Sequence, residues 1–189
     1  MSIIGKKAPA FNGEAAKNGD NTTIGLDDYK GRWLVMFFYP LDFTFVCPTE
    51  LVAFDNAREQ FAAAGADLLG VSVDSVHTHL AWMRTPRNEA GVGSLGYPLL
   101  SDLDKSISAA FDVLSGDVSL RGVFIIDPSG TVQASTVNNL PIGRNVSEVL
   151  RTLKAAQHVS TSGLVCPANW QDGDTGMEIS LDGVKSVIS

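Results

Sequence analysis

The sequence predicts an α/β fold in which helices pack on both faces of a central sheet. Two runs of almost uninterrupted apolar residues, at 33–39 and 67–73, are typical of strands that are buried on both faces. Each run is followed by a segment in which apolar residues recur at helical spacing. With 189 residues, of which 44% are hydrophobic and 19% charged, the chain is long enough to bury one ordinary core.

Strands and helices alternate along the chain, and one hairpin lies near its end. In order we expect a strand at 33–39, a helix at 48–64, a strand at 67–73, a helix at 75–82, an extended piece at 98–100, a helix at 102–111, a hairpin of strands at 121–126 and 131–137, and a helix at 145–158. A thioredoxin-like fold has this order of elements. The hairpin would add antiparallel strands to a sheet that begins as a parallel one.

The pattern changes after His158. Residues 160–189 contain several glycines and show little helical periodicity. We therefore expect a domain over 1–159 and a C-terminal arm over 160–189 that packs on a partner subunit. A frayed tail is the alternative interpretation of the arm.

The charge balance excludes several classes of partner. The chain has 14 Lys and Arg against 21 Asp and Glu, which gives a net charge of -7. This balance argues against binding to a nucleic-acid backbone and against docking on an anionic membrane surface. The most apolar window, 34–45, is too short to span a bilayer, and residues 1–11 do not resemble a signal peptide. We expect a cytoplasmic protein with no membrane or nucleic-acid partner.

The two cysteines are the first candidates for chemistry. In a reducing compartment, a pair of cysteines is more often catalytic or metal-binding than structural. Cys47 is expected as the N-cap of the helix that Pro48 begins, where unpaired N–H groups and the helix dipole favour a thiolate. Glu50 is placed to reach back to the N-cap N–H. The alternative is that Cys47 is a small buried apolar residue.

A metal site is not expected. The chain has no Cys-x-x-Cys motif, and its histidines have no suitable spacing to the cysteines. His77 and His79 are two residues apart, so they point to different sides of a helix and are expected as surface or packing residues. Cys47 and Cys166 are far apart in the sequence, yet each lies in a Val-Cys-Pro segment. A distant thiol can still resolve an oxidised one if the arm reaches it.

The segment 37–50 resembles the active-site loop of the typical two-cysteine peroxiredoxins. Pro40, Thr44 and Cys47 fill its Pro-x-x-x-Thr-x-x-Cys pattern. Arg121 matches the active-site arginine of this family, and Cys166 matches its resolving cysteine. The resemblance runs from about Gly5 to the C-terminus, and it is nearest to the bacterial alkyl hydroperoxide reductase peroxidase subunit.

The resemblance implies a thiol-dependent peroxidase of antioxidant defence that reduces hydrogen peroxide and alkyl hydroperoxides to water and alcohols. Cys47 would become a sulfenic acid, and Cys166 of another subunit would convert it to a disulfide. Thr44 would bridge the thiolate and the peroxide, Arg121 would place a permanent charge beside the sulfur, and Pro40 would shield the pocket from water.

The resemblance also implies partners. It predicts an antiparallel homodimer that assembles into a ring of ten chains, with no cofactor. A separate disulfide reductase, either a flavoprotein or a thioredoxin-like protein, would supply the electrons. The alternatives are a ring-forming holdase chaperone or peroxide sensor, and a thioredoxin-fold binding module whose cysteines are inert.

Overall fold

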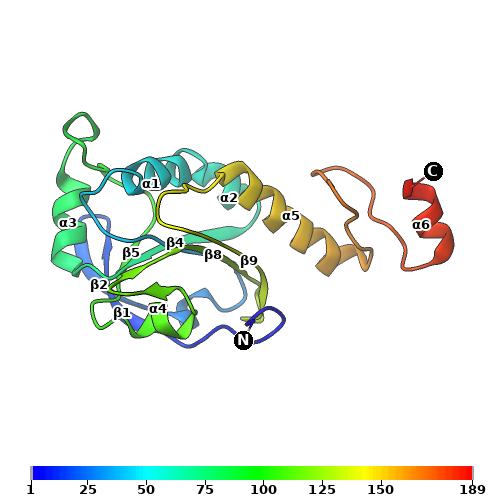
Figure 1. Cartoon of the computed structure of the whole chain (residues 1–189), viewed down its shortest axis with the longest axis horizontal. Coiled ribbons are helices and arrows are strands. Elements are labelled where there is room, and N and C mark those ends of the chain that lie inside the picture. Colours follow the sequence, from blue (N-terminus) through cyan, green and yellow to red (C-terminus); the bar gives the residue numbers. More distant parts are fainter. Residues whose placement is uncertain (1, 189) are drawn as a thin grey trace. The chain divides into compact units, whose positions relative to one another are not determined.

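The computed structural model describes residues 2–188, which form two compact units (Figure 1). The first unit ends at Val146 and contains the sheet; the second begins at Ser147 and contains most of helix α5 (Val146–Ser162) and all of α6 (Leu181–Ile188). The domain boundary expected between 159 and 160 falls inside α5, which is one continuous helix. Helix α5 therefore belongs with the arm and not with the sheet domain.

The first unit is built on a mixed sheet of seven strands in the order β2-β1-β5-β4-β3-β8-β9. Its strands are β1 (Asn12–Lys17), β2 (Asp20–Gly25), β3 (Trp33–Phe38), β4 (Ala66–Ser72), β5 (Leu99–Ser101), β8 (Arg121–Ile126) and β9 (Val132–Asn138). Strand β4 is parallel to β3 and β5, whereas β8 is antiparallel to both β3 and β9. The expected combination of a parallel start and an antiparallel hairpin is confirmed. Strands β6 (Leu114–Ser115) and β7 (Val118–Ser119) form a separate small sheet.

Helices cover both faces of this sheet. In Figure 1, α1 (Cys47–Asn56) and α2 (Arg58–Ala63) run along one side, and α4 (Ser106–Ala110) lies on the other. Strand β3 explains why both sides must be covered, because its alternate side chains are buried in both directions. Met36 belongs to the core cluster that includes Phe111, whereas the ring of Phe37 stacks on Phe54 of α1 at 4.1 Å.

Three elements differ from the sequence-based expectation. The hairpin β1–β2 was not expected, although its Asn18-Gly19 pair has positive φ at both residues, the conformation that such a tight turn needs. The helix expected at 48–64 is divided at Ala57 into α1 and α2. The helix expected from Asp102 begins only at Ser106, although Asp102 still accepts hydrogen bonds from N–H groups of its first turn.

The arm also contains a helix that was not expected. Leu181, Val184 and Ile188 recur at the spacing of one helical face, and the segment forms α6. The expectation of little helical periodicity was therefore wrong for its last residues. Helix α3 (Val76–Arg84) also belongs to the first unit, and the Ser75 side chain caps it by accepting a hydrogen bond from the Thr78 N–H. None of the helices in the described part of the chain is long and apolar enough to cross a bilayer.

Candidate active site

The loop between β3 and α1 carries the cysteine of the first unit. Strand β3 ends just before Pro40, which is buried, and α1 begins at Cys47. The N-cap is Val46, so Cys47 lies one position further into the helix than expected. Cys47 is a free thiol that is only 1% exposed. The sulfur is therefore held inside the protein, in the first turn of a helix.

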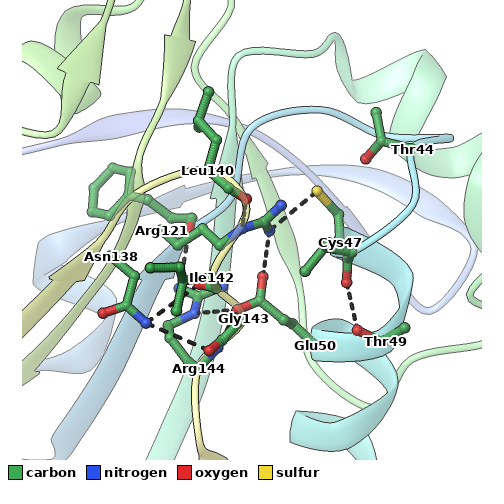
Figure 2. A network of polar contacts seen from close by, with 12 residues as sticks. Thr44, Cys47, Thr49, Glu50, Arg121, Asn138, Leu140, Ile142, Gly143 and Arg144 are labelled. Atoms are coloured by element: carbon green, nitrogen blue, oxygen red, sulfur yellow. Dashed lines mark hydrogen bonds and ion pairs between the residues drawn. The ribbon is translucent and has the colours of Figure 1, made fainter.

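Arg121 provides a charged group in contact with this sulfur (Figure 2). It is the first residue of β8, which lies next to β3 in the sheet. Its Nη1 donates to Cys47 Sγ at 3.4 Å and to Glu50 Oε2 at 2.5 Å, while its Nε donates to the carbonyl of Leu140 at 2.6 Å. These contacts fix the plane of the guanidinium beside the sulfur.

Glu50 binds a second arginine with its other oxygen. The backbone N–H and the Nε of Arg144 both donate to Glu50 Oε1 at 2.8 Å. Nη1 of Arg144 donates to the carbonyls of Phe38 and Gly122, at 2.8 Å and 2.7 Å. The expected contact of Glu50 with the N-cap was thus wrong, because two buried guanidinium groups take both of its oxygens.

The cluster of Glu50, Arg121 and Arg144 carries a net positive charge. All three side chains are at most 5% exposed, so solvent screens them weakly. One carboxylate cannot balance two guanidinium groups, and burial of uncompensated charge is costly. An anion at Cys47 Sγ would balance the remaining charge.

Arg144 also packs against aromatic rings. Its Cζ lies 5.3 Å from the ring centre of Phe37 and 5.7 Å from that of Phe54. Burial lowers the pKa of the Arg144 guanidinium below its usual value, and its hydrogen bonds with Glu50 oppose that shift. Nη2 of Arg144 has no hydrogen-bond partner within residues 2–188. The two rings therefore hold this guanidinium by packing, whereas its Nη2 contributes no hydrogen bond.

Thr44 lies on the loop that precedes Cys47. Its hydroxyl donates to the carbonyl of Leu41 at 2.9 Å, which leaves the oxygen able to accept a hydrogen bond. In the view of Figure 2, Thr44 and the Arg121 guanidinium lie on opposite sides of the Cys47 sulfur. Four of the five residues expected at the site, Pro40, Thr44, Cys47 and Arg121, therefore belong to one unit and to neighbouring elements.

Cys166, the fifth expected residue, belongs to the second unit. It is a half-buried free thiol that donates to the carbonyl of Ala155 at 3.6 Å. Burial raises its pKa above the usual thiol value, and the positive charge of Arg151 partly opposes the shift. The segment that carries it pairs Val165 with Met177.

Sequence reasoning did not identify Arg144 as a site residue or Glu50 as its partner. Their contacts join residues 94 positions apart, so no local pattern reveals them. Within residues 2–188, no group of three or more His, Cys, Asp or Glu side chains is placed to hold a metal ion.

Comparison with known proteins identifies the family. Residues 4–135 match the model of the AhpC/TSA family, and residues 155–189 match that of the C-terminal domain of 1-Cys peroxiredoxin. The chain belongs to the AhpC/TSA family. It is 50% identical to Peroxiredoxin-2 of Rattus norvegicus over 188 residues, which cover 98% of this chain and 95% of that protein.

Solved structures agree with this family. The reduced 2-Cys peroxiredoxin of Plasmodium vivax matches with a TM-score of 0.96 and 46% identity, over 99% of this chain and 98% of that one. AhpC of Enterococcus faecalis matches with a TM-score of 0.83 and 34% identity, over 88% of this chain and 100% of that one. The expected likeness to the bacterial subunit is compatible with these values, although the chain is less identical to AhpC than to the Plasmodium vivax protein. The thioredoxin-like fold and the thiol-dependent peroxidase activity are confirmed.

Removal of the shared carboxylate should destabilise the protein strongly. We expect Glu50→Gln to lower the free energy of unfolding by about 3–5 kcal/mol, because it leaves two buried guanidinium groups without their counter-charge. Glu148→Gln is the matched control, since it removes an exposed carboxylate that pairs with Arg151, and it should cost less than about 1 kcal/mol. Urea unfolding of both variants measures the difference. Equal losses would contradict the account of the cluster.

Proposed function

We propose that Cys47 is the thiol of this peroxidase that reacts with the peroxide. The observation that carries the proposal is the contact between Arg121 Nη1 and Cys47 Sγ, inside a buried cluster with a net charge of +1. A thiolate is the nucleophile in such chemistry, and this cluster favours an anion at the sulfur.

The first step oxidises the sulfur by two electrons. The Cys47 thiolate attacks one peroxide oxygen, an S–O bond forms and the O–O bond breaks. The other oxygen leaves with the bonding electron pair and takes a proton, which gives water or an alcohol. Cys47 is then a sulfenic acid, the first stage of thiol oxidation.

Three neighbours assist this step. Arg121 donates to the sulfur and stabilises the charge that moves onto the leaving oxygen. The Thr44 oxygen, which is free to accept, receives a hydrogen bond from a hydroperoxide and so orients it. Pro40 is buried and has no N–H, so it shields the sulfur from water and does not itself donate a hydrogen bond to the sulfur.

We further propose that Cys166 resolves the sulfenic acid. Its thiolate attacks the Cys47 sulfur, a disulfide forms, and the hydroxide that leaves becomes water. The two Cα atoms of a disulfide lie within about 7 Å, and Cys47 is almost fully buried in a helical turn. The first turn of α1 and the segment around Cys166 therefore have to unwind before the bond forms.

The proposal extends to the assembly of the subunits and to the reductase. We expect Cys166 of one subunit to react with Cys47 of another in an antiparallel homodimer, and five such dimers to form a ring. A flavoprotein or thioredoxin-like reductase would reduce the disulfide. Family membership favours the peroxidase over the holdase chaperone, the peroxide sensor and the inert binding module. A cytoplasmic location stays a prediction from the sequence.

Intact mass and non-reducing gels test both roles. We treat the native protein, Cys47→Ser and Cys166→Ser with one equivalent of hydrogen peroxide. The native protein should form a disulfide-linked dimer, Cys166→Ser should give a monomer that has gained about 16 Da, one oxygen, and Cys47→Ser should stay unchanged. Unmodified monomers in all three samples would contradict the proposed function.

The resolving step should accelerate with pH. The ordinary pKa of a cysteine thiol already lies above neutral, and burial raises that of Cys166 further, so the thiol is mostly protonated at neutral pH. Its thiolate fraction grows about tenfold for each pH unit below the pKa. We expect disulfide formation from the preformed sulfenic acid to quicken accordingly between about pH 6 and pH 8. Rapid acid quench followed by mass analysis measures this rate. A flat profile would show that Cys166 is not the group whose ionisation controls resolution.

A further inference from the structure

A second buried polar cluster lies beneath the loop that carries Thr44. Tyr39 follows the last residue of β3, Asp42 lies in the loop, and His79 belongs to α3. The Tyr39 hydroxyl donates to Asp42 Oδ1 at 2.7 Å, and His79 Nδ1 lies 2.7 Å from Asp42 Oδ2. The side chains of Asp42 and His79 are both 0% exposed. His79 was expected as a surface or packing residue. It is a buried residue whose ring also contacts a carboxylate.

The hydrogen-bond donors of this cluster follow from its contacts. Burial and the neighbouring Asp42 carboxylate hold the pKa of Tyr39 well above its usual value, so its hydroxyl remains a donor. Nε2 of His79 is buried and has no hydrogen-bond partner in the described part of the chain. Nδ1 faces a carboxylate oxygen of Asp42, which accepts, so Nδ1 carries the proton that points at Asp42.

Asp42 also fixes the loop through its backbone. Its N–H donates to Asp74 Oδ2 at 2.6 Å, and Asp74 lies just after β4. Ser72 and Ser101 hydroxyls donate to the side chain and the carbonyl of Asp74, at 3.4 Å and 2.7 Å. Asp42 is thus bonded to groups from the ends of two central strands and from α3.

The loop needs such an anchor because it has no regular secondary structure. Phe43, the next residue, has a φ of 52° and a half-exposed side chain, so its backbone conformation is one that phenylalanine rarely adopts. The centre of its ring lies 5.8 Å from that of Trp82, a residue of α3. The position of Thr44, one residue further on, therefore depends on how firmly Asp42 is held.

We propose that Asp42, held by Tyr39 and His79, is a positioning residue. It keeps the loop that bears Pro40 and Thr44 in the right place relative to Cys47. This inference rests on the proposed function, because it assumes that Cys47 reacts with peroxide. Asp42 does not touch the sulfur. It acts by keeping the Thr44 oxygen where a peroxide bound at Cys47 can reach it, and small displacements of such groups are costly to the rate.

Tyr39→Phe is the most direct test, since it removes one hydroxyl and keeps the ring. The variant is made in a Cys166→Ser background, so that only the first step is observed. We expect the second-order rate constant of Cys47 with hydrogen peroxide to fall about tenfold. Alkylation of Cys47 by iodoacetamide should not fall, because that reagent needs the thiolate but makes no use of Thr44.

Tyr97→Phe is the matched control. Tyr97 is another buried tyrosine, and its hydroxyl donates to the carbonyl of Leu51 at 2.7 Å. Both variants lose one buried hydrogen bond, so their loss of stability should be similar. Only Tyr39→Phe should slow the reaction with peroxide. Similar peroxide rates in the two variants, or a rate for Tyr39→Phe within about twofold of its parent, would overturn the proposal.

A second pair of variants tests the histidine. Asn at position 79 can present an N–H near the place of Nδ1, whereas Leu cannot. We expect His79→Asn to retain most of the peroxide rate and His79→Leu to lose about tenfold of it. Equal rates would overturn the role of His79. If the Cys166→Ser parent itself fails to react with peroxide, the proposed function fails; if the parent reacts and the variants match it, only the positioning inference fails.

Discussion

The carboxylate of Glu50 is the group on which the rest of the site depends. It joins three parts of the fold, because it lies on α1 and binds Arg121 of β8 and Arg144 of the segment after β9. Without it, two guanidinium groups would be buried with no counter-charge. With it, the guanidinium beside Cys47 is held in one plane, and the cluster still carries the positive charge that a thiolate balances.

The sheet explains how these groups meet. Strands β3 and β8 are antiparallel neighbours, so the end of β3 and the beginning of β8 lie at the same edge. The loop to α1 leaves from this edge, and Arg121 starts the second strand there. Arg144 binds the carbonyls of Phe38 and Gly122, one from each strand, and so ties the site to the sheet itself. The position of Cys47 is a consequence of strand order as much as of the loop sequence.

Much of this arrangement could be predicted from local patterns, and the rest depends on contacts that are distant in sequence. The apolar runs at 33–39 and 67–73 predicted the central strands, and Pro48 predicted the start of α1 to within one residue. Glu50, however, follows Cys47 as a capping residue would, and only the fold brings it to Arg144. The same is true of His79, because helical spacing alone does not reveal that a buried carboxylate faces it. Helix α6 was missed for a different reason, because glycines nearby masked its apolar spacing.

The most direct test of the account is the rate at which Cys47 reacts with hydrogen peroxide in Arg121→Lys. Lysine keeps the positive charge, but it has no planar fork that can bind Glu50, the Leu140 carbonyl and the sulfur together. If oriented donation to the sulfur is what activates Cys47, the second-order rate constant, measured by stopped flow, should fall by about a hundredfold or more. A rate within about threefold of the native protein would show that charge alone suffices, and the central role given to the Glu50 cluster would be wrong.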